Sequence, residues 1–339
     1  AGNRLVLVAN PDYFEGRAYI DEVVMRIIPD QSTQFMELGA GNLDTISLSP
    51  QQYLYQTKGP GWTDNFRKFQ YVASAYSYLG YNLTSPLFSD VRVRQAINHA
   101  IDKDEIVRGV LSGLGQAANG PYKPGTWAYN ARIPANEFDQ DKAQRLLAQA
   151  GWQRKDGTGP LKDAKGRSFA FTILTNQGNS QRIKAAIIIQ SRLKDLGIQV
   201  EIRTVEWASF IKEFVDKGRF DALLLGWNIL QDPDLYDVWH SSKAVPGGLN
   251  FVGYKNAELD DLLERGRRSL DQTLRKGIYD RIQEILHQDQ PYCFLYVPMA
   301  LPMVHARVMG ITPAPAGITH NFIRWWIPKS HQGPELTQQ

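Results

Sequence analysis

The sequence contains a single cysteine, Cys293, among its 339 residues. One cysteine allows no intrachain disulfide and no cysteine-based metal site. Because Cys293 lies in the apolar run PYCFLYVPM, we expect it to be a buried small hydrophobic residue. No two of the six histidines are spaced i, i+4 on one expected helix, so a zinc site has no local support. We therefore expect neither a metal ion nor another cofactor.

The sequence also lacks a strong charge bias and a long hydrophobic run. Lys and Arg number 38 against 35 Asp and Glu, which leaves a net charge of +3, and no run of five basic residues occurs. Nucleic acid and anionic membranes are therefore not expected as partners. No apolar stretch approaches the roughly 18 residues of a membrane helix, and the first residues form neither a signal peptide nor a lipidation motif. Either the chain is intracellular or a targeting segment has been removed, and composition does not decide between them.

Two domains are expected from the length, and the pattern along the chain is of mixed α/β type. The N-terminal part combines strands at 4–9, 22–28 and 44–48 with a helix at 34–40, and the alternation in 22–28 is typical of a strand with one side against a core. Helices are then expected at 91–101, from Asp102 to Gly113, and at 140–150, with a proline-rich loop at 117–136.

Residues 168–227 give the clearest architecture. Strands at 168–175, 198–205 and 220–226 alternate with helices at 182–196 and 207–217, which predicts βαβ units in an open sheet. Ligands of such sheets bind beyond the carboxyl ends of the strands, so Gly226, Trp227 and Asn228 are expected at a binding edge. Two more helices, at 257–269 and 274–289, precede a short strand at 294–297 and a proline-rich, aromatic tail at 312–328.

The segment SGLGQAA, residues 112–118, fits the dinucleotide fingerprint in its glycine spacing only. That fingerprint requires a strand before the glycines and a helix after them, whereas here a helix precedes and a loop follows. Neither G-x-S-x-G nor an exposed catalytic cysteine is present. These motifs therefore predict no dinucleotide site and no nucleophilic hydrolase.

The segment GWNILQDPDLYDVWHSS places carboxylates beside aromatic rings just after the most apolar strand. Asp232 and Asp234 could serve glycoside hydrolysis as acid and base, or could hold a cationic or hydroxyl-rich ligand against the rings. Alternatively, Asp232 begins a turn and Asp234 caps the following helix. The hydrolase interpretation is weakened because residues two apart on a short turn rarely reach the roughly 5–9 Å separation that two catalytic carboxylates need.

Several segments, in order, resemble the family 5 extracellular solute-binding proteins, the receptors of dipeptide, oligopeptide and nickel ABC importers. They are NPDYFEGRAYIDEVVMRIIPD (10–30), GNLDTI (41–46), SPLFSDVRVRQAINHAIDKDEIVRGVLSGLGQAA (85–118), DQDKAQRLLAQAGW (139–152), GWNILQDPD (226–234) and FVGYKNAELDDLLERGR (251–267). The block at 85–118 is the most specific of them. The resemblance spans nearly the whole chain.

This resemblance implies a periplasmic-binding-protein-like (type II) fold of two α/β lobes that enclose a solute. Residues 1–80 and 296–339 would form lobe I, and residues 81–295 lobe II. Hinge closure would occur about 76–82 and 294–299. Family members carry a longer N-terminal part of lobe I, so the resemblance implies that the first lobe is incomplete, with an open sheet edge or an exposed apolar patch.

The resemblance also implies function and partners. The expected protein is a receptor without enzymatic activity that captures a peptide-like or other small polar solute for the membrane subunits of an ABC importer. It is expected to be a monomer in the periplasm or outside the cell, anchored to a membrane only if the missing N-terminus carries an anchor. The expected ligand-binding residues are Trp227, Asn228, Asp232, Tyr78 and Asn82.

One departure from the family concerns the solute. Peptide-binding members place an aspartate three residues after the tryptophan of the G-W motif, where it pairs with the peptide's α-amine, but this sequence has Leu230 there. Asp232 is the alternative anchor, because the loop is about one residue shorter before Asp-Pro-Asp. Weak binding of short peptides with a free amine is therefore expected.

Overall fold

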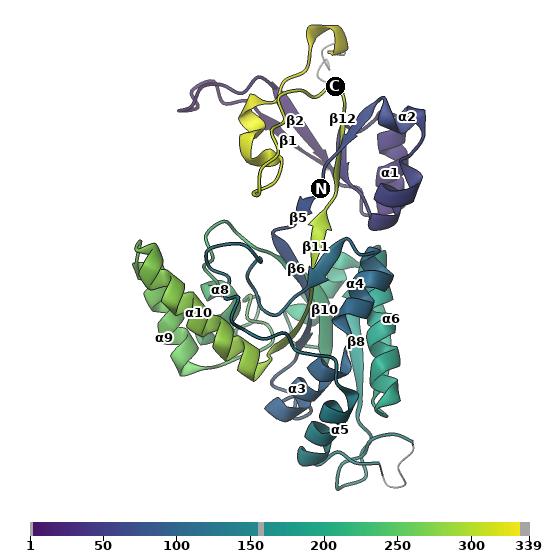
Figure 1. Cartoon of the computed structure of the whole chain (residues 1–339), viewed down its shortest axis with the longest axis vertical. Helices are drawn as coiled ribbons and strands as arrows, with labels where there is room; N and C mark the ends of the chain where they lie inside the picture. Colours follow the sequence, from purple (N-terminus) through teal and green to yellow (C-terminus); the bar gives the residue numbers. More distant parts are fainter. Residues whose placement is uncertain (1–2, 155–158, 333–339) are drawn as a thin grey trace. The chain divides into compact units, whose positions relative to one another are not determined.

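The computed structural model describes residues 3–154 and 159–332, and the chain divides into two compact units (Figure 1). Unit 1 comprises Ala1–Ala73 and Met299–Gln339, and unit 2 comprises Ser74–Pro298. The chain therefore passes from one unit to the other twice, after Ala73 and after Pro298.

Unit 1 contains a three-stranded antiparallel sheet in the order β3–β12–β4. Strands β3 (Thr45–Ser47) and β4 (Phe66–Lys68) precede unit 2 in the sequence, whereas β12 (Pro302–His305) follows it. The two separate segments of unit 1 thus share one sheet. One buried hydrophobic cluster of unit 1 comprises Val304, Val308, Ile318 and Trp325.

Two helices and a short strand complete the part of unit 1 that precedes unit 2: α1 (Gln31–Gly39), α2 (Pro60–Thr63) and β5 (Tyr71–Val72). Helix α1 begins three residues earlier than the sequence pattern predicts. The cause is an N-cap, because Oδ1 of Asp30 accepts a hydrogen bond from the backbone N–H of Thr33 at 2.7 Å.

Strands β1 (Arg4–Val8) and β2 (Glu22–Arg26) form a separate two-stranded antiparallel ribbon in unit 1. Both strands are where the sequence predicts them, but the expectation that β2 has one side against a core is wrong. Leu7 and Met25 are 47% and 49% exposed, and Val8 is 70% exposed. An apolar pocket of about 240 Å³ lies against the ribbon, lined in part by Leu7 and Val23.

Unit 2 is built on a mixed sheet whose strands follow the order β7–β11–β6–β10–β8–β9. Their bounds are β7 Gly115–Ala117, β11 Tyr292–Ala300, β6 Ala75–Tyr81, β10 Ala222–Asn228, β8 Ala170–Asn176 and β9 Gln199–Val205. Strands β8, β9 and β10 are parallel, which confirms the predicted βαβ units, and β6 is antiparallel to both β10 and β11. At its far end β11 pairs with β5 through Met299 and Ala300.

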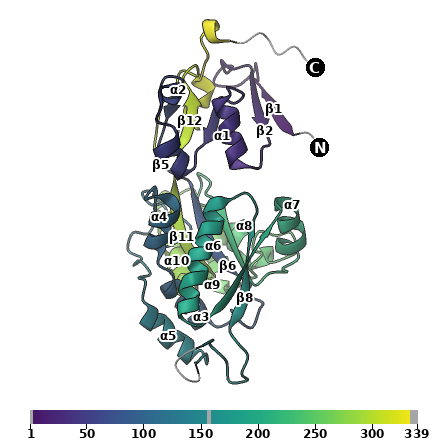
Figure 2. The same ribbon diagram turned by 90° about the vertical axis from the view of Figure 1, so that its right-hand side faces the viewer.

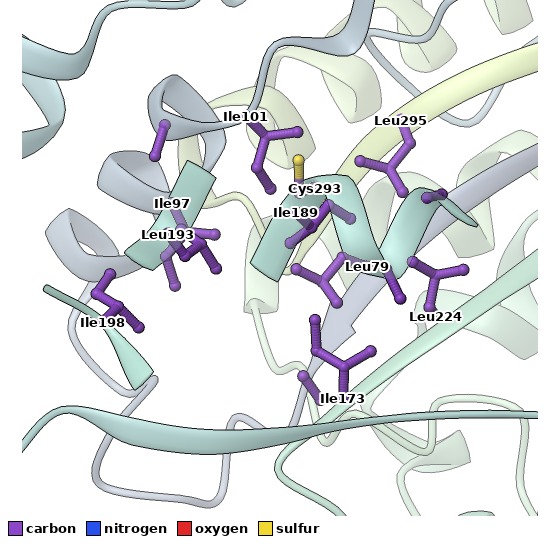
Figure 3. Close-up of a cluster of buried hydrophobic side chains, with 14 of the residues drawn as sticks. Leu79, Ile97, Ile101, Ile173, Ile189, Leu193, Ile198, Leu224, Cys293 and Leu295 are labelled. Atoms are coloured by element: carbon purple, nitrogen blue, oxygen red, sulfur yellow. The ribbon is translucent and has the colours of Figure 1, made fainter. Parts of the chain in front are cut away.

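Helices cover both faces of this sheet (Figure 2). On one face lie α3 (Val91–Ala100), α4 (Lys103–Leu111), α5 (Gln140–Gln149) and α6 (Ser180–Asp195), and on the other α8 (Tyr236–Trp239), α9 (Ala257–Arg268) and α10 (Gln272–Asp289). The main core lies under the first group, where side chains of β6, β8, β10 and β11 meet those of α3 and α6 (Figure 3). Labelled there are Leu79, Ile97, Ile101, Ile173, Ile189, Leu193, Ile198, Leu224, Cys293 and Leu295. Cys293 is fully buried, as its apolar neighbours predict.

Local signals explain most element boundaries in unit 2. Asp102 caps α4 as predicted, since its Oδ1 accepts from the N–H of Glu105 at 2.9 Å. Residues 112–118 leave helix α4 and enter strand β7, the reverse of the order that a dinucleotide site needs. The single helix predicted at 207–217 is instead a short α7 (Trp207–Ser209) followed by a π-helical segment, Phe210–Val215. Other short helical segments are Gln52–Gln56, Ser241–Lys243, Thr319–Arg324 and Lys329–His331.

Candidate functional site

The candidate site lies at one edge of the sheet of unit 2. The parallel strands β8 and β10 both end there, β8 at Asn176 and β10 at Trp227 and Asn228. Helix α6 begins at the same edge, because it follows β8 after a short turn capped by Asn179. The sequence-based rule for open α/β sheets thus places Trp227 and Asn228 where ligands of this architecture bind.

Trp227 presents an aromatic ring that its neighbours hold in place. The ring stacks on Phe251, with a centroid distance of 5.9 Å, and lies parallel to the ring of Tyr78 at 6.4 Å. Its Nε1 donates a hydrogen bond to the hydroxyl of Tyr292 at 3.4 Å. A ring fixed in this way can stack on a ligand without losing much conformational entropy.

Asn228 is the last residue of β10, and its side chain is exposed. Its carboxamide forms no hydrogen bond with the residues that the structure describes. It therefore offers both donors and an acceptor to a ligand.

Arg182, in the first turn of α6, was not predicted from the sequence. Its Nη1 donates to Oδ1 of Asn176 at 2.7 Å, and its Nη2 lies so close to Gly226 that a Cβ there would be 3.3 Å away. Within residues 3–154 and 159–332, no carboxylate forms an ion pair with Arg182. Burial lowers the pKa of this guanidinium, yet an arginine remains a cation at neutral pH.

An incompletely solvated cation without a counter-charge is costly, and an anionic ligand group would relieve that cost. The partial positive charge at the start of α6 adds to the preference for an anion. Arg182, Asn228 and Trp227 offer a cation, a hydrogen-bonding group and an aromatic ring at this strand edge. No local pattern distinguishes Arg182 from an ordinary solvated helix arginine, so sequence reasoning missed it.

Tyr78 lies inside the unit rather than at the surface of the site. It is fully buried in β6, where its ring stacks on Tyr292 with a centroid distance of 3.9 Å. Burial raises the pKa of the Tyr78 hydroxyl well above its ordinary value. Tyr78 therefore packs against the Trp227 ring, and its own ring is not accessible to a solute.

Asn82 is not brought together with Trp227 and Asn228. Because β6 runs antiparallel to β10, Trp227 pairs with Tyr76, whereas the backbone of Asn82 meets Asp221 at the other end of the strand pair. The carboxamide of Asn82 donates to the carbonyl oxygens of Gly218 and Phe220, and it accepts from Thr84. Asn82 thus holds the turn before β10 in place.

Asp232 and Asp234 lie in the loop between β10 and α8, and both carboxylates already have partners. Asp232 forms an ion pair of 2.6 Å with Arg275, and Asp234 one of 2.7 Å with Arg267. The hydrogen bond from Arg275 is the main cause that lowers the pKa of Asp232.

The same two carboxylates also organise the local backbone. Oδ1 of Asp232 accepts from the N–H of Asp234, and Oδ1 of Asp234 accepts from the N–H of Tyr236 at the start of α8. The bond of Asp232 is the turn role that the sequence offered as the alternative to a ligand-binding or catalytic role. Asp234 holds the backbone just before α8, but the predicted N-cap is wrong, because Leu235 occupies that position. The pKa of Asp232 is lowered, which is the opposite of what a general acid needs.

Two kinds of site are not found in the described part of the chain. No three His, Cys, Asp or Glu side chains among residues 3–154 and 159–332 lie together as a metal site. In those same ranges, no helix combines the length and the apolar character that crossing a membrane requires.

Comparison with known proteins places this site in a family context. The family model described as bacterial extracellular solute-binding proteins, family 5 middle, matches residues 1–246. The oligopeptide-binding protein AppA of Bacillus subtilis (strain 168) is 37% identical over 334 residues, which are 97% of this chain and 60% of AppA. A probable di/tripeptide-binding protein 5 of Pseudomonas aeruginosa (strain UCBPP-PA14) is 30% identical over 91% of this chain and 56% of its own length.

Solved structures give the same picture. AppA from Bacillus subtilis in complex with a nonapeptide has a TM-score of 0.85 and 36% identity, covering 97% of this chain and 64% of AppA. DppA from Helicobacter pylori in complex with the peptide STSA has a TM-score of 0.80 and 31% identity, covering 96% of this chain and 60% of DppA. The chain thus spans about 60% of the length of the curated relative AppA. The matches are to binding proteins and give no support to the hydrolase alternative.

Proposed function

Because this chain belongs to the bacterial extracellular solute-binding proteins of family 5, we propose that it is the larger part of a receptor that delivers a peptide-like, carboxylate-bearing solute to an ABC importer. The family consists of binding proteins, not enzymes. We assign unit 1 to lobe I and unit 2 to lobe II, with boundaries at 73/74 and 298/299 rather than at 80/81 and 295/296. The shift follows from β6 and most of β11, which belong to the sheet of unit 2.

The observation that carries the proposal is the position of Arg182. It is a cation without a carboxylate partner in the described residues, and it lies beside Gly226, at the strand edge that also holds the free carboxamide of Asn228. A peptide offers one terminal carboxylate and a series of amides, which match these groups. The relatives named above as binding peptides support the peptide-like class.

The proposed place of action is outside the cytoplasm, as the description of the family implies. The membrane subunits of the importer are the proposed macromolecular partner. Trp227 would contribute a stacking surface, and Asn228 a neutral hydrogen bond. Asp232 contributes little in the native protein, because Arg275 occupies its carboxylate.

The proposal is tested by titration calorimetry with alanine-rich tripeptides and nonapeptides, each as the free acid and as the C-terminal amide. We expect the free acid to bind at least tenfold more tightly than the amide, since a hydrogen bond to a charged group contributes roughly 1.5–3 kcal/mol. In Arg182→Gln this difference should vanish. Arg145→Gln removes the same charge from the exposed surface of α5 and serves as the matched control.

Binding of none of these peptides would refute the peptide-like class. Equal binding of acid and amide by the unaltered protein would instead refute the role of Arg182. Each peptide that binds should raise the melting temperature, because bound ligand stabilises the folded form. No peptide should be cleaved.

A further inference from the structure

Two arginines of the α9–α10 helix pair hold the loop between β10 and α8. Arg267 at the end of α9 binds Asp234, and Arg275 near the start of α10 binds Asp232, at 2.7 and 2.6 Å. Both carboxylates of the loop 229–235, all of which the structure describes, are therefore neutralised. The remaining prominent side chain of this loop is Leu230, which is 74% exposed and uncharged.

Arg275 is fixed by contacts that do not depend on Asp232. Its Nη2 and Nε donate to the hydroxyl of Tyr279 at 2.6 and 3.2 Å. Its guanidinium also lies over the rings of Trp127 and Tyr279, at 5.4 and 5.2 Å from their centroids. The Arg275 side chain is 12% exposed, against 58% for Asp232. The guanidinium of Arg275 is thus held by aromatic side chains, independently of its ion pair with the carboxylate of Asp232.

This arrangement leaves unequal charges around the strand edge. Arg182 has no acidic partner in the described part of the chain, whereas each acidic group of the adjoining loop has a basic one. A solute carboxylate finds a free cation there. A solute ammonium finds no free carboxylate in the loop, and would have to displace a guanidinium that is already hydrogen-bonded and stacked.

Building on the proposed function, we infer that Arg275 is a specificity-determining residue that keeps Asp232 paired, so that the receptor selects solutes by their carboxylate and ignores a free α-amine. Arg275 acts through Asp232 and is a positioning residue. The chemical class that the site accepts then includes peptides whose N-terminus is acylated or cyclised, as well as free peptides.

The test compares peptides that differ only in N-acetylation: alanine-rich tripeptides and nonapeptides with free C-termini, titrated into the full-length protein. The measured quantity is the ratio of Kd for the acetylated peptide to Kd for its free-amine twin. The variants are Arg275→Gln, Arg275→Lys, Asp232→Asn and the double variant with Arg275→Gln and Asp232→Asn. Arg281→Gln is the matched control, because it removes other ion pairs of α10, those with Glu258 and Glu284, without touching the loop.

We expect a ratio near one in the unaltered protein, in Asp232→Asn, in Arg275→Lys and in Arg281→Gln. In Arg275→Gln the freed carboxylate should bind the amine and raise the ratio about tenfold, the effect of one charge-assisted hydrogen bond. The double variant should return the ratio to near one. A merely structural role of Arg275 would weaken both peptides equally and leave the ratio unchanged.

An unchanged ratio in Arg275→Gln, with binding intact, overturns this inference and leaves the proposed function standing. A high ratio in the unaltered protein that Asp232→Asn abolishes overturns it too, because Asp232 would then be available despite Arg275. Binding of no peptide to the unaltered protein overturns the proposed function and this inference together. Thermal unfolding of each variant, monitored by circular dichroism, confirms that the variants compared are folded.

Discussion

Arg192 of α6 donates two parallel hydrogen bonds to the carboxylate of Glu105 on α4, through Nε at 2.7 Å and through Nη2 at 2.8 Å. This pair joins the two helices over the main core. Both side chains are about one-third exposed, so the pair is only partly screened by water.

We predict that Glu105→Gln lowers the free energy of unfolding by about 0.5–1 kcal/mol, because the two-point geometry places the pair at the upper end of the range for surface ion pairs. Glu213→Gln, which breaks the exposed pair with Lys217, should cost less than about 0.5 kcal/mol. Urea unfolding followed by fluorescence measures both. An equal cost for the two variants would contradict the argument from geometry.

A second prediction concerns the buried contact between β11 and α3. The thiol of Cys293 donates to Oδ1 of Asn98 at 3.0 Å, and Nδ2 of Asn98 donates to Oε1 of Gln290 at 2.7 Å. All three side chains are at most 2% exposed. Asn98→Ala should therefore cost about 1–3 kcal/mol, since it leaves the amide of Gln290 without this partner. Cys293→Ser, which keeps a donor, should cost less.

The reactivity of Cys293 provides an independent measurement. Burial raises the pKa of its thiol to about 11. At pH 8 we expect a thiol reagent to label it only as fast as unit 2 opens, with a rate that increases with urea. Asn98→Ala should accelerate labelling in proportion to its loss of stability. Immediate labelling of the native protein would contradict the burial of this residue.

Two glycine-to-alanine substitutions should have opposite signs. At Gly226 in β10, an added Cβ would lie 2.8 Å from the carbonyl oxygen of Tyr76 and 3.3 Å from the guanidinium of Arg182. We expect Gly226→Ala to destabilise the protein by about 1–3 kcal/mol and to weaken solute binding. Gly277, in the middle of α10, has nothing within 4 Å of an added Cβ. Gly277→Ala should stabilise by about 0.5–1 kcal/mol, and equal effects at the two sites would refute the packing at Gly226.

The stability of unit 2 should fall as the pH drops below about 6.5, the value for an unfolded histidine. Burial lowers the pKa of His99 and of His287, and the nearby Lys103 contributes in the same direction. The unfolded chain therefore takes up protons at a higher pH than the folded chain does, so that protonation favours unfolding. Urea titrations between pH 7.5 and 5 measure how steeply the free energy of unfolding falls with pH. This fall should be smaller in the variant with His99→Gln and His287→Gln. An unchanged pH dependence would contradict the role of these two histidines.

Elements defined by local signals could be predicted from the sequence, and elements defined by distant partners could not. Asp90 and Asp102 cap α3 and α4, so the starts of both helices are readable from a few residues. Strand β6 was missed, because its residues are buried on both faces and give no alternation. Its place between β10 and β11 depends on residues more than a hundred positions away.

The same distinction applies to the site. Trp227 and Asn228 follow from a general rule about strand ends. Arg182 does not, since only the absence of an acidic partner in space sets it apart from other helix arginines. Asn82 was predicted to lie at the site because the family resemblance assigns residues 76–82 to a hinge. The antiparallel direction of β6, which carries Asn82 to the far end of the strand pair, could not be predicted.

The order of the segments along the chain has a consequence for biosynthesis. Unit 2 is one continuous segment, Ser74–Pro298, whereas the central strand β12 of the unit 1 sheet is encoded after it. On a ribosome, the first segment of unit 1 therefore emerges long before the strand that must pair with both β3 and β4. During that interval these strands and the apolar β1–β2 ribbon have no native partner from the last segment. Until β12 has been made, the earlier segment of unit 1 is thus exposed to chaperones and proteases.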